Sequence, residues 1–194
     1  MPTIAEKILS LEDYFAIEEP MEIRHEFVNG QLTEMPGESP VASEIASNLL
    51  VILKMALKGQ AFKVYTHDVK LLIEHLGNVR YPDLVVVRQE GVQKKLVTQP
   101  VLIVEVLSDG TEKTDREEKL REYLAIPTLQ TYLLVSGKKM LVEAYFRGEK
   151  RWEFAFFEQP GDLIELPDLG LKFTPAEIYE AIVFEDSLAA KPGS

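Results

Sequence analysis

Two uninterrupted apolar runs constrain the fold of this chain more than any other feature. Residues 84–87 read Leu-Val-Val-Val, and residues 101–107 read Val-Leu-Ile-Val-Glu-Val-Leu. Short runs of this kind are typical of strands that are covered on both faces, as in the centre of an α/β sheet. The chain is therefore predicted to contain a central sheet with helices against it.

Each of these predicted strands carries an acid. Asp83 follows Pro82 at the opening of the first strand, and Glu105 lies inside the second. An unpaired buried carboxylate is costly unless it becomes protonated, and a divalent metal ion is one partner that stabilises it. The alternatives are a turn aspartate bonded to nearby backbone N–H groups for Asp83 and a strand-end salt bridge for Glu105.

A charged helix is predicted directly after the second strand, from a cap at Thr114 to about residue 125. Asp115, Lys119 and Tyr123 are spaced by four residues and so share one face of this helix. The alternative is a solvated helix with an ordinary Asp–Lys pair. Lys119 is of interest because its helix follows the strand of Glu105.

The other elements follow from turn and cap signals. Ser10 to Asp13 resembles a helix start, and Asn29-Gly30 is a strong hairpin signal. The remaining elements are a helix over 11–17, hairpin strands over 23–28 and 31–35, a helix from 39 to 58, strands over 62–65 and 69–73, a strand meander over 131–135, 140–146 and 152–157, an edge strand over 162–166, and a last short helix from 174.

Composition limits the class of protein. The 194 residues suit one domain, with a core over about 10–182 and a disordered tail at 186–194. The absence of cysteine excludes disulfides and thiolate metal sites and fits a cytoplasmic protein. No signal peptide is recognisable, and the longest apolar stretch is too short to span a membrane. A net charge of −11 argues against nonspecific binding to polyanions.

The two strand motifs resemble a known family. Residues 80–87 and 100–108, together with Asp115, Lys119 and Tyr123, are similar to the Uma2 family of restriction-endonuclease-like proteins in the PD-(D/E)XK superfamily. Segments 24–30 and 35–39 also match, so the resemblance covers roughly residues 10–147. It implies an α/β restriction endonuclease-like fold, with a mixed central β-sheet flanked by helices, an N-terminal β-hairpin and a C-terminal strand meander.

The resemblance also implies a metal site. Asp83 and Glu105 would be metal ligands and catalytic residues, and Glu26 would be an additional acid from the first hairpin. A hard cation such as Mg²⁺, with Mn²⁺ as the alternative, prefers oxygen ligands, and the backbone carbonyl of Val106 could complete the set. For Glu26, the alternative is a cross-strand pair on the surface.

The catalytic lysine departs from the superfamily pattern. A lysine is expected two residues after the glutamate, but Leu107 occupies that position. Uma2-like sequences supply a lysine from the following helix, where Lys119 is the match, and Asp115 and Tyr123 would orient it. A histidine that many members carry early in the second helix is missing, since residues 41–43 read Val-Ala-Ser.

These observations predict a Mg²⁺-dependent DNA endonuclease. One alternative is a catalytically inactive interaction module on a nuclease fold, and another is a phosphodiesterase acting on RNA or nucleotides. Aromatic residues of the meander are expected in sheet packing or in a homodimer edge. These aromatic residues are Tyr145, Phe146, Trp152, Phe154, Phe156 and Phe157.

Overall fold

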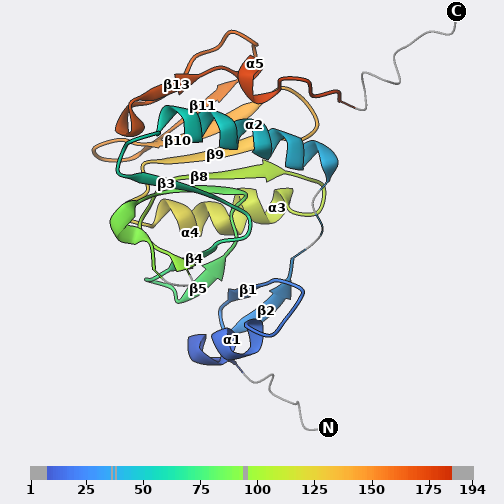
Figure 1. The fold of residues 1–194 in the computed structure, drawn as a ribbon, viewed down its shortest axis with the longest axis vertical. Coiled ribbons are helices and arrows are strands. Elements are labelled where there is room, and N and C mark those ends of the chain that lie inside the picture. The colour runs from blue at the N-terminus through green and yellow to red at the C-terminus, as the bar shows by residue number, and fades with distance from the viewer. Residues whose placement is uncertain (1–7, 36, 38, 94–95, 185–194) are drawn as a thin grey trace, which may run out of the picture.

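The computed structural model describes residues 8–35, 37, 39–93 and 96–184, so the tail at 186–194 lies outside the described residues (Figure 1). The first of its two larger sheets has five strands in the order β2-β1-β5-β4-β7. Its strands are β1 (His25–Val28), β2 (Gln31–Glu34), β4 (Lys70–Ile73), β5 (Asn78–Arg80) and β7 (Leu96–Val97).

The second sheet has six strands in the order β11-β10-β9-β8-β6-β3. Its strands are β3 (Phe62–Thr66), β6 (Leu84–Arg88), β8 (Pro100–Leu107), β9 (Thr131–Ser136), β10 (Val142–Arg147) and β11 (Trp152–Phe157). β8 pairs with β9 in parallel and with β6 antiparallel, so the sheet is mixed. All eight residues of β8 are buried, which confirms the predicted central strand.

The six-stranded sheet is the predicted mixed central sheet, but the second, five-stranded sheet was not predicted. The N-terminal hairpin belongs to the five-stranded sheet, where Phe27 of β1 pairs with Val79 of β5. No element is predicted for residues 78–80, but they form β5 and pair with β1 and β4. Their three-residue length gives too little periodicity to identify a strand from the sequence.

Helices cover both faces of the six-stranded sheet, and Figure 1 shows α2 and α4 on opposite sides of β8. The helices are α1 (Leu11–Glu18), α2 (Pro40–Ala56), α3 (Glu112–Thr114), α4 (Leu120–Leu124) and α5 (Pro175–Ile178). On one face of the sheet, Val104 belongs to the same core cluster as Ile45 and Leu49 of α2. On the opposite face, Ile103 and Leu107 belong to a second cluster. Glu105 therefore points to the α4 side, because alternate residues of a strand share a face.

Local signals explain the first elements. Ser10 and Asp13 form a reciprocal capping box at the start of α1. Ser39 accepts a hydrogen bond from the Ala42 backbone N–H, with proline at the first turn of α2. Asn29 and Gly30 have φ angles of 52° and 79°, as a tight hairpin turn requires. These predictions are confirmed.

The charged helix differs from its prediction. It begins at Glu112 rather than after a Thr114 cap, and a π-helical turn, η2 (Asp115–Lys119), separates α3 from α4. The Thr111 side chain makes no capping hydrogen bond. The acid and lysine spacing indicated a helix but carried no signal for the wider turn.

The C-terminal part also corrects one element. β12 (Ile164–Leu166) pairs with β13 (Leu171–Phe173) in a separate two-stranded sheet and is not an edge of the main sheet. Short 3₁₀ helices, η1 (Gln89–Gly91) and η3 (Pro167–Leu169), complete the elements. Among the described residues, no helix has the length and apolar character needed to cross a membrane.

Candidate active site

A cavity of about 280 Å³ lies where β6 begins and β8 ends. Asp83, Glu105, Val106 and Lys119 all contribute to its wall. Leu84 pairs with Val104 across the two antiparallel strands. Asp83, which precedes Leu84, and Glu105, which follows Val104, therefore also lie opposite each other. The topology therefore brings together two acids that are 22 positions apart.

Hydrogen bonds fix this pair of acids. The Asp83 backbone N–H donates to Glu105 Oε2 at 3.3 Å, and the Val106 backbone N–H donates to Asp83 Oδ2 at 2.6 Å. Each carboxylate is thus held by the backbone of the other strand. Glu105 is only 2% exposed, so its charge needs a partner.

Lys119 supplies a positive charge to three carboxylates. Its Nζ lies 3.0 Å from Glu105 Oε1, 3.0 Å from Asp115 Oδ1 and 3.5 Å from Glu26 Oε1. The Tyr123 hydroxyl donates to Glu105 Oε1 at 2.9 Å, so Tyr123 contacts the acid rather than the lysine. Lys119 is 6% exposed, which excludes the solvated Asp–Lys pair as its environment.

The π-helical turn η2 begins at Asp115 and ends at Lys119. Both residues are buried: Lys119 bonds to Glu105 of β8, and the Tyr132 hydroxyl of β9 donates to the Asp115 backbone carbonyl at 3.2 Å. π-helical turns inside α-helices are often found at functional sites. In this chain the turn contains the cation and one of the acids that it pairs with.

Glu26 lies within 3.5 Å of Lys119 but does not share the cavity of Asp83. It lines a second cavity of about 530 Å³, which Lys119 also lines, and it is absent from the wall of the first. Glu26 Oε2 accepts a hydrogen bond from Arg80 Nη1 at 2.6 Å, and the Glu26 residue is only 8% exposed. The surface-pair alternative for Glu26 is therefore wrong.

Arg80 is a buried member of this network that sequence reasoning missed. Its Nε and Nη2 donate to the two carboxylate oxygens of Glu122, both at 2.9 Å. Asn78 Nδ2 also donates to Glu122, at 3.1 Å. The sequence does show an arginine next to the matched Tyr81-Pro82-Asp83 run. It does not show that Arg80 is buried, because this follows from its place in β5.

A second missed network supports the cavity wall. Glu18, at the end of α1, is 6% exposed and accepts hydrogen bonds from the Tyr81 hydroxyl at 2.9 Å and the His25 backbone N–H at 3.0 Å. Tyr81 lines the cavity beside Asp83. The sequence carries no signal for this contact, because Glu18 and Tyr81 are 63 positions apart.

The pKa values of Glu105 and Glu26 are shifted in opposite directions. Burial raises the pKa of Glu105 well above its usual range, and the nearby Asp115, Asp83 and Glu26 add to this, while Lys119 opposes it. Burial also acts to raise the pKa of Glu26, but Lys119 and Arg80 outweigh it and the pKa is lowered. Burial acts to lower the pKa of Lys119, yet its three carboxylates hold it well above the usual range. Lys119 is therefore a protonated ammonium.

The donor set can be compared with the needs of a metal ion. In the described parts of the chain, no group of three or more His, Cys, Asp or Glu side chains is arranged to hold one. Two carboxylates, Asp83 and Glu105, share the cavity wall with Val106. This oxygen-rich set fits a Mg²⁺ ion that keeps several of its waters. Glu26 faces Arg80 and Lys119 instead.

Comparison with known proteins identifies the family. Residues 11–176 match the sequence profile of Uma2, which is described as "Putative restriction endonuclease". The chain belongs to the Uma2 family. The match extends beyond the segments on which the resemblance rested and includes the β9–β11 meander.

Two curated proteins from Synechocystis sp. are similar to this chain. The "Uncharacterized protein slr1290" is 34% identical over 178 residues, which cover 91% of this chain and 94% of the relative. The "Uncharacterized protein sll1609" is 30% identical over 151 residues, which cover 75% of this chain and 85% of the relative. Their names assign no activity.

One solved structure has a similar fold. It is described as a "putative nuclease belonging to DUF820" from Anabaena variabilis, with a TM-score of 0.71 and 16% sequence identity. The alignment covers 88% of this chain and 97% of that chain. The mixed α/β fold of this Uma2 protein is therefore shared with that protein.

Proposed function

We propose that this Uma2 protein is a Mg²⁺-dependent endonuclease that hydrolyses phosphodiester bonds in DNA. The observation that carries the proposal is the convergence of Asp83 and Glu105 in one cavity with Lys119 in its wall. Membership of a family described as "Putative restriction endonuclease" supports the same reaction class.

Asp83, Glu105 and the Val106 carbonyl are the groups that would hold the metal, with Mn²⁺ as an alternative to Mg²⁺. When bound, such a metal activates a water for attack and neutralises charge on the phosphodiester. The water oxygen would form a new bond to phosphorus as the bond between phosphorus and the leaving sugar oxygen breaks. The water would release a proton to solvent, and the leaving oxygen would take up a proton from solvent.

The protein residues have distinct parts in this reaction. The backbone N–H groups of Asp83 and Val106 hold the two carboxylates in place. The Lys119 ammonium provides positive charge that stabilises the charge developing on the phosphoryl group. Asp115 and Glu26 keep Lys119 protonated and directed at Glu105, and Tyr123 orients Glu105.

Nicking of supercoiled plasmid tests this proposal. Mg²⁺ or Mn²⁺ should support nicking by the parent protein, and Asp83→Ala should abolish it. Asp168→Ala, at an exposed acid in η3, is the matched control and should retain activity. Cleavage of RNA or a nucleotide diester but not DNA would favour the alternative phosphodiesterase.

An interaction module is the second candidate, and the edge strand β11 favours it. β11 is bonded only to β10 within the described sheet, and its Phe154 and Phe156 are 54% and 59% exposed. Tyr145 and Trp152 instead pack against the α4 side of the sheet, as expected. An exposed apolar edge strand can pair with a strand of another chain. We propose β11 as the interface of the predicted homodimer.

The homodimer is tested by sedimentation. The parent protein should have the mass of a dimer, and Phe154→Ser with Phe156→Ser should produce a folded monomer. A parent that is monomeric at all concentrations would refute this interface. Metal-dependent nicking that Asp83→Ala abolishes would refute a purely non-catalytic module.

A further inference from the structure

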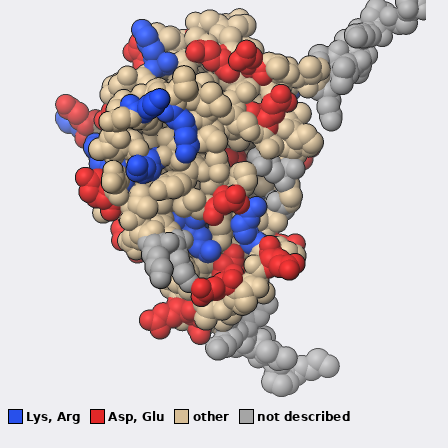
Figure 2. All heavy atoms as spheres, in the orientation of Figure 1, with Lys and Arg blue, Asp and Glu red and all other residues tan. Residues whose placement is uncertain are grey.

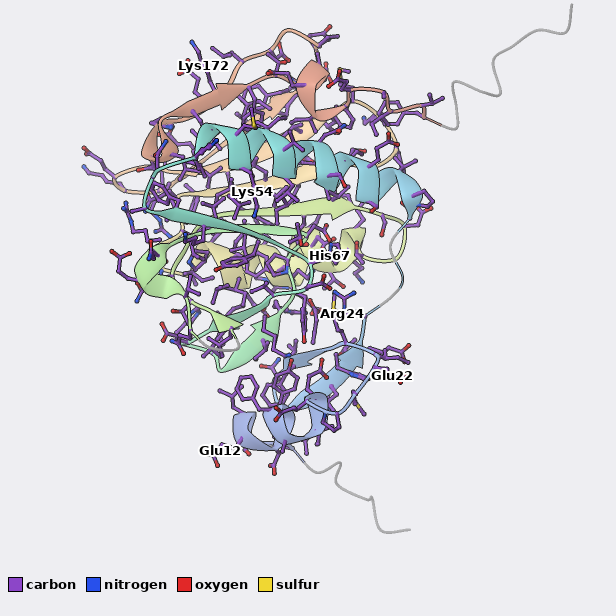
Figure 3. All side chains as sticks on the ribbon, in the orientation of Figure 1. Glu12, Glu22, Arg24, Lys54, His67 and Lys172 are labelled. Carbon is purple, nitrogen blue, oxygen red and sulfur yellow. The ribbon has the colours of Figure 1, made fainter. Side chains whose placement is uncertain are left out.

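Arg24 stands at the mouth of the candidate active site. It precedes β1, whereas His67 follows β3, and the two residues line the same cavity as Asp83 and Glu105. Figure 3 shows the Arg24 and His67 labels beside each other on this side of the molecule. The fold therefore brings a guanidinium from the N-terminal hairpin to the entrance of a site built by the other sheet.

The contacts of Arg24 are of a kind that a ligand can exchange. Its Nη1 donates to the His67 backbone carbonyl at 2.8 Å and lies 2.6 Å from Asp68 Oδ1. The side chains of Arg24 and Asp68 are 42% and 70% exposed. An exposed ion pair is screened by water and contributes little, so an incoming anion can replace Asp68 at little cost.

Charge distinguishes Arg24 from the other cation of the cavity. Lys119 is already balanced by three buried carboxylates. Arg24 pairs with the exposed Asp68, and a guanidinium can bind phosphate with two parallel N–H bonds. Figure 2 shows that basic side chains on this face lie in small groups next to acidic ones. Because the chain has a net charge of −11, binding to DNA requires local cations such as Arg24 to attract the phosphates.

We propose that Arg24 binds a backbone phosphate of the DNA substrate, and that Asp68 competes with this phosphate for the guanidinium. The proposal rests on the proposed DNA endonuclease function and adds a substrate-binding residue to it. Binding exchanges the Arg24–Asp68 pair for an Arg24–phosphate pair, while Arg24 Nη1, which contacts both groups, keeps its hydrogen bond to the His67 carbonyl. Asp68 thus weakens binding without touching Asp83 or Glu105.

The first test measures binding of a labelled DNA duplex by fluorescence anisotropy between about 50 and 200 mM salt, in Ca²⁺. Arg24→Gln should lower affinity about 5- to 10-fold and reduce the salt slope by about 1, as expected for one lost phosphate contact. Lys172→Gln removes the same charge from β13, far from Arg24 in Figure 3, and should change neither value.

The second test uses a gain of binding, which a misfolded variant cannot produce. Asp68→Asn should raise affinity about 3-fold, and the gain should vanish in the Arg24→Gln background, because coupled residues are not additive. Glu165→Gln on β12 is the charge-matched control. Arg24→Lys should recover part of the affinity, since it restores the charge but not the two parallel bonds.

Two results would overturn the inference. One is an Arg24→Gln protein that binds DNA as well as Lys172→Gln does. The other is a gain from Asp68→Asn that persists without Arg24. If the parent protein binds and nicks DNA while these variants behave like their controls, this inference fails and the proposed function stands. A parent that does not bind the duplex refutes both.

Discussion

Lys119 and Arg24 line the same cavity, but they are held in opposite ways. Lys119 is 6% exposed and lies within 3.5 Å of three carboxylates. Arg24 is 42% exposed at its side chain and pairs with Asp68, which is itself 70% exposed. The first ion pair is enclosed by protein, and the second is open to water.

This difference separates a fixed charge from an exchangeable one. Removing one partner of a buried ion pair leaves an uncompensated charge, whereas an exposed pair is screened and weak. Lys119 is therefore suited to hold the acids of the site in place, and Arg24 is suited to release its partner for a ligand. Five predictions test this contrast and the charge network around Lys119.

The largest effect is expected from Lys119→Met. Three carboxylates would lose their shared cation, so the free energy of unfolding should fall by about 3–5 kcal/mol. Arg24→Met should cost less than about 1 kcal/mol, because its pair is exposed. Urea denaturation measures both, and equal losses would remove the distinction between the two cations.

Divalent cations should stabilise the site next to Lys119. At a hundredfold excess over its dissociation constant, Mn²⁺ should raise the free energy of unfolding by about 2.7 kcal/mol. Asp83→Asn should lose this increment, while Arg24→Gln should keep it. Thermal denaturation with and without Mn²⁺ measures the shift, and an unchanged shift in Asp83→Asn would show that the ion binds elsewhere.

Arg80→Lys should cost about 2 kcal/mol, because a lysine cannot reproduce the paired bonds to Glu122 together with the bond to Glu26. Arg88→Lys, at an exposed position on β6, is the matched control. Urea denaturation compares the two variants. Equal stability in both would mean that Arg80 does not hold the Glu26 side of the network.

The pH dependence should show the raised pKa of Glu105. The folded protein then binds more protons than the unfolded chain between about pH 4.3 and the folded pKa, so metal-free stability falls as pH rises through this window. The loss is about 1.4 kcal/mol per pH unit from this group. Glu105→Gln should lack this fall. A stability profile identical to that of the parent would contradict the assignment.

The opposite sign is expected from Glu26, whose pKa is lowered in the folded protein. Its contribution is present above about pH 4.3, the unfolded value, and is lost as the pH falls through the folded pKa. Glu26→Gln should therefore reduce the loss of stability in acid, whereas Glu105→Gln should not. The two variants compared over the same pH range separate the two acids.

Local signals of the sequence were sufficient where one segment determines the outcome. The cap at Ser10, the Asn29-Gly30 turn and the two apolar runs predicted α1, the β1–β2 hairpin, β6 and β8 correctly. Each follows from backbone preference or from periodicity within a few residues. The charged helix was predicted, but its start and its π-helical turn were not, because they depend on how Asp115 and Lys119 meet β8.

The acids and the lysine themselves were named from the sequence, together with the family. Only the tertiary structure decided which of them lie together. Asp83 and Glu105 meet because β6 pairs with β8. Glu26 contacts Arg80 because β1 pairs with β5. The same pairing of distant segments places Arg24 beside Asp68 at the cavity mouth. Residue types determine which charges a chain contains, but strand register and burial decide which charges share a partner, because the interaction depends on distance and on exclusion of water.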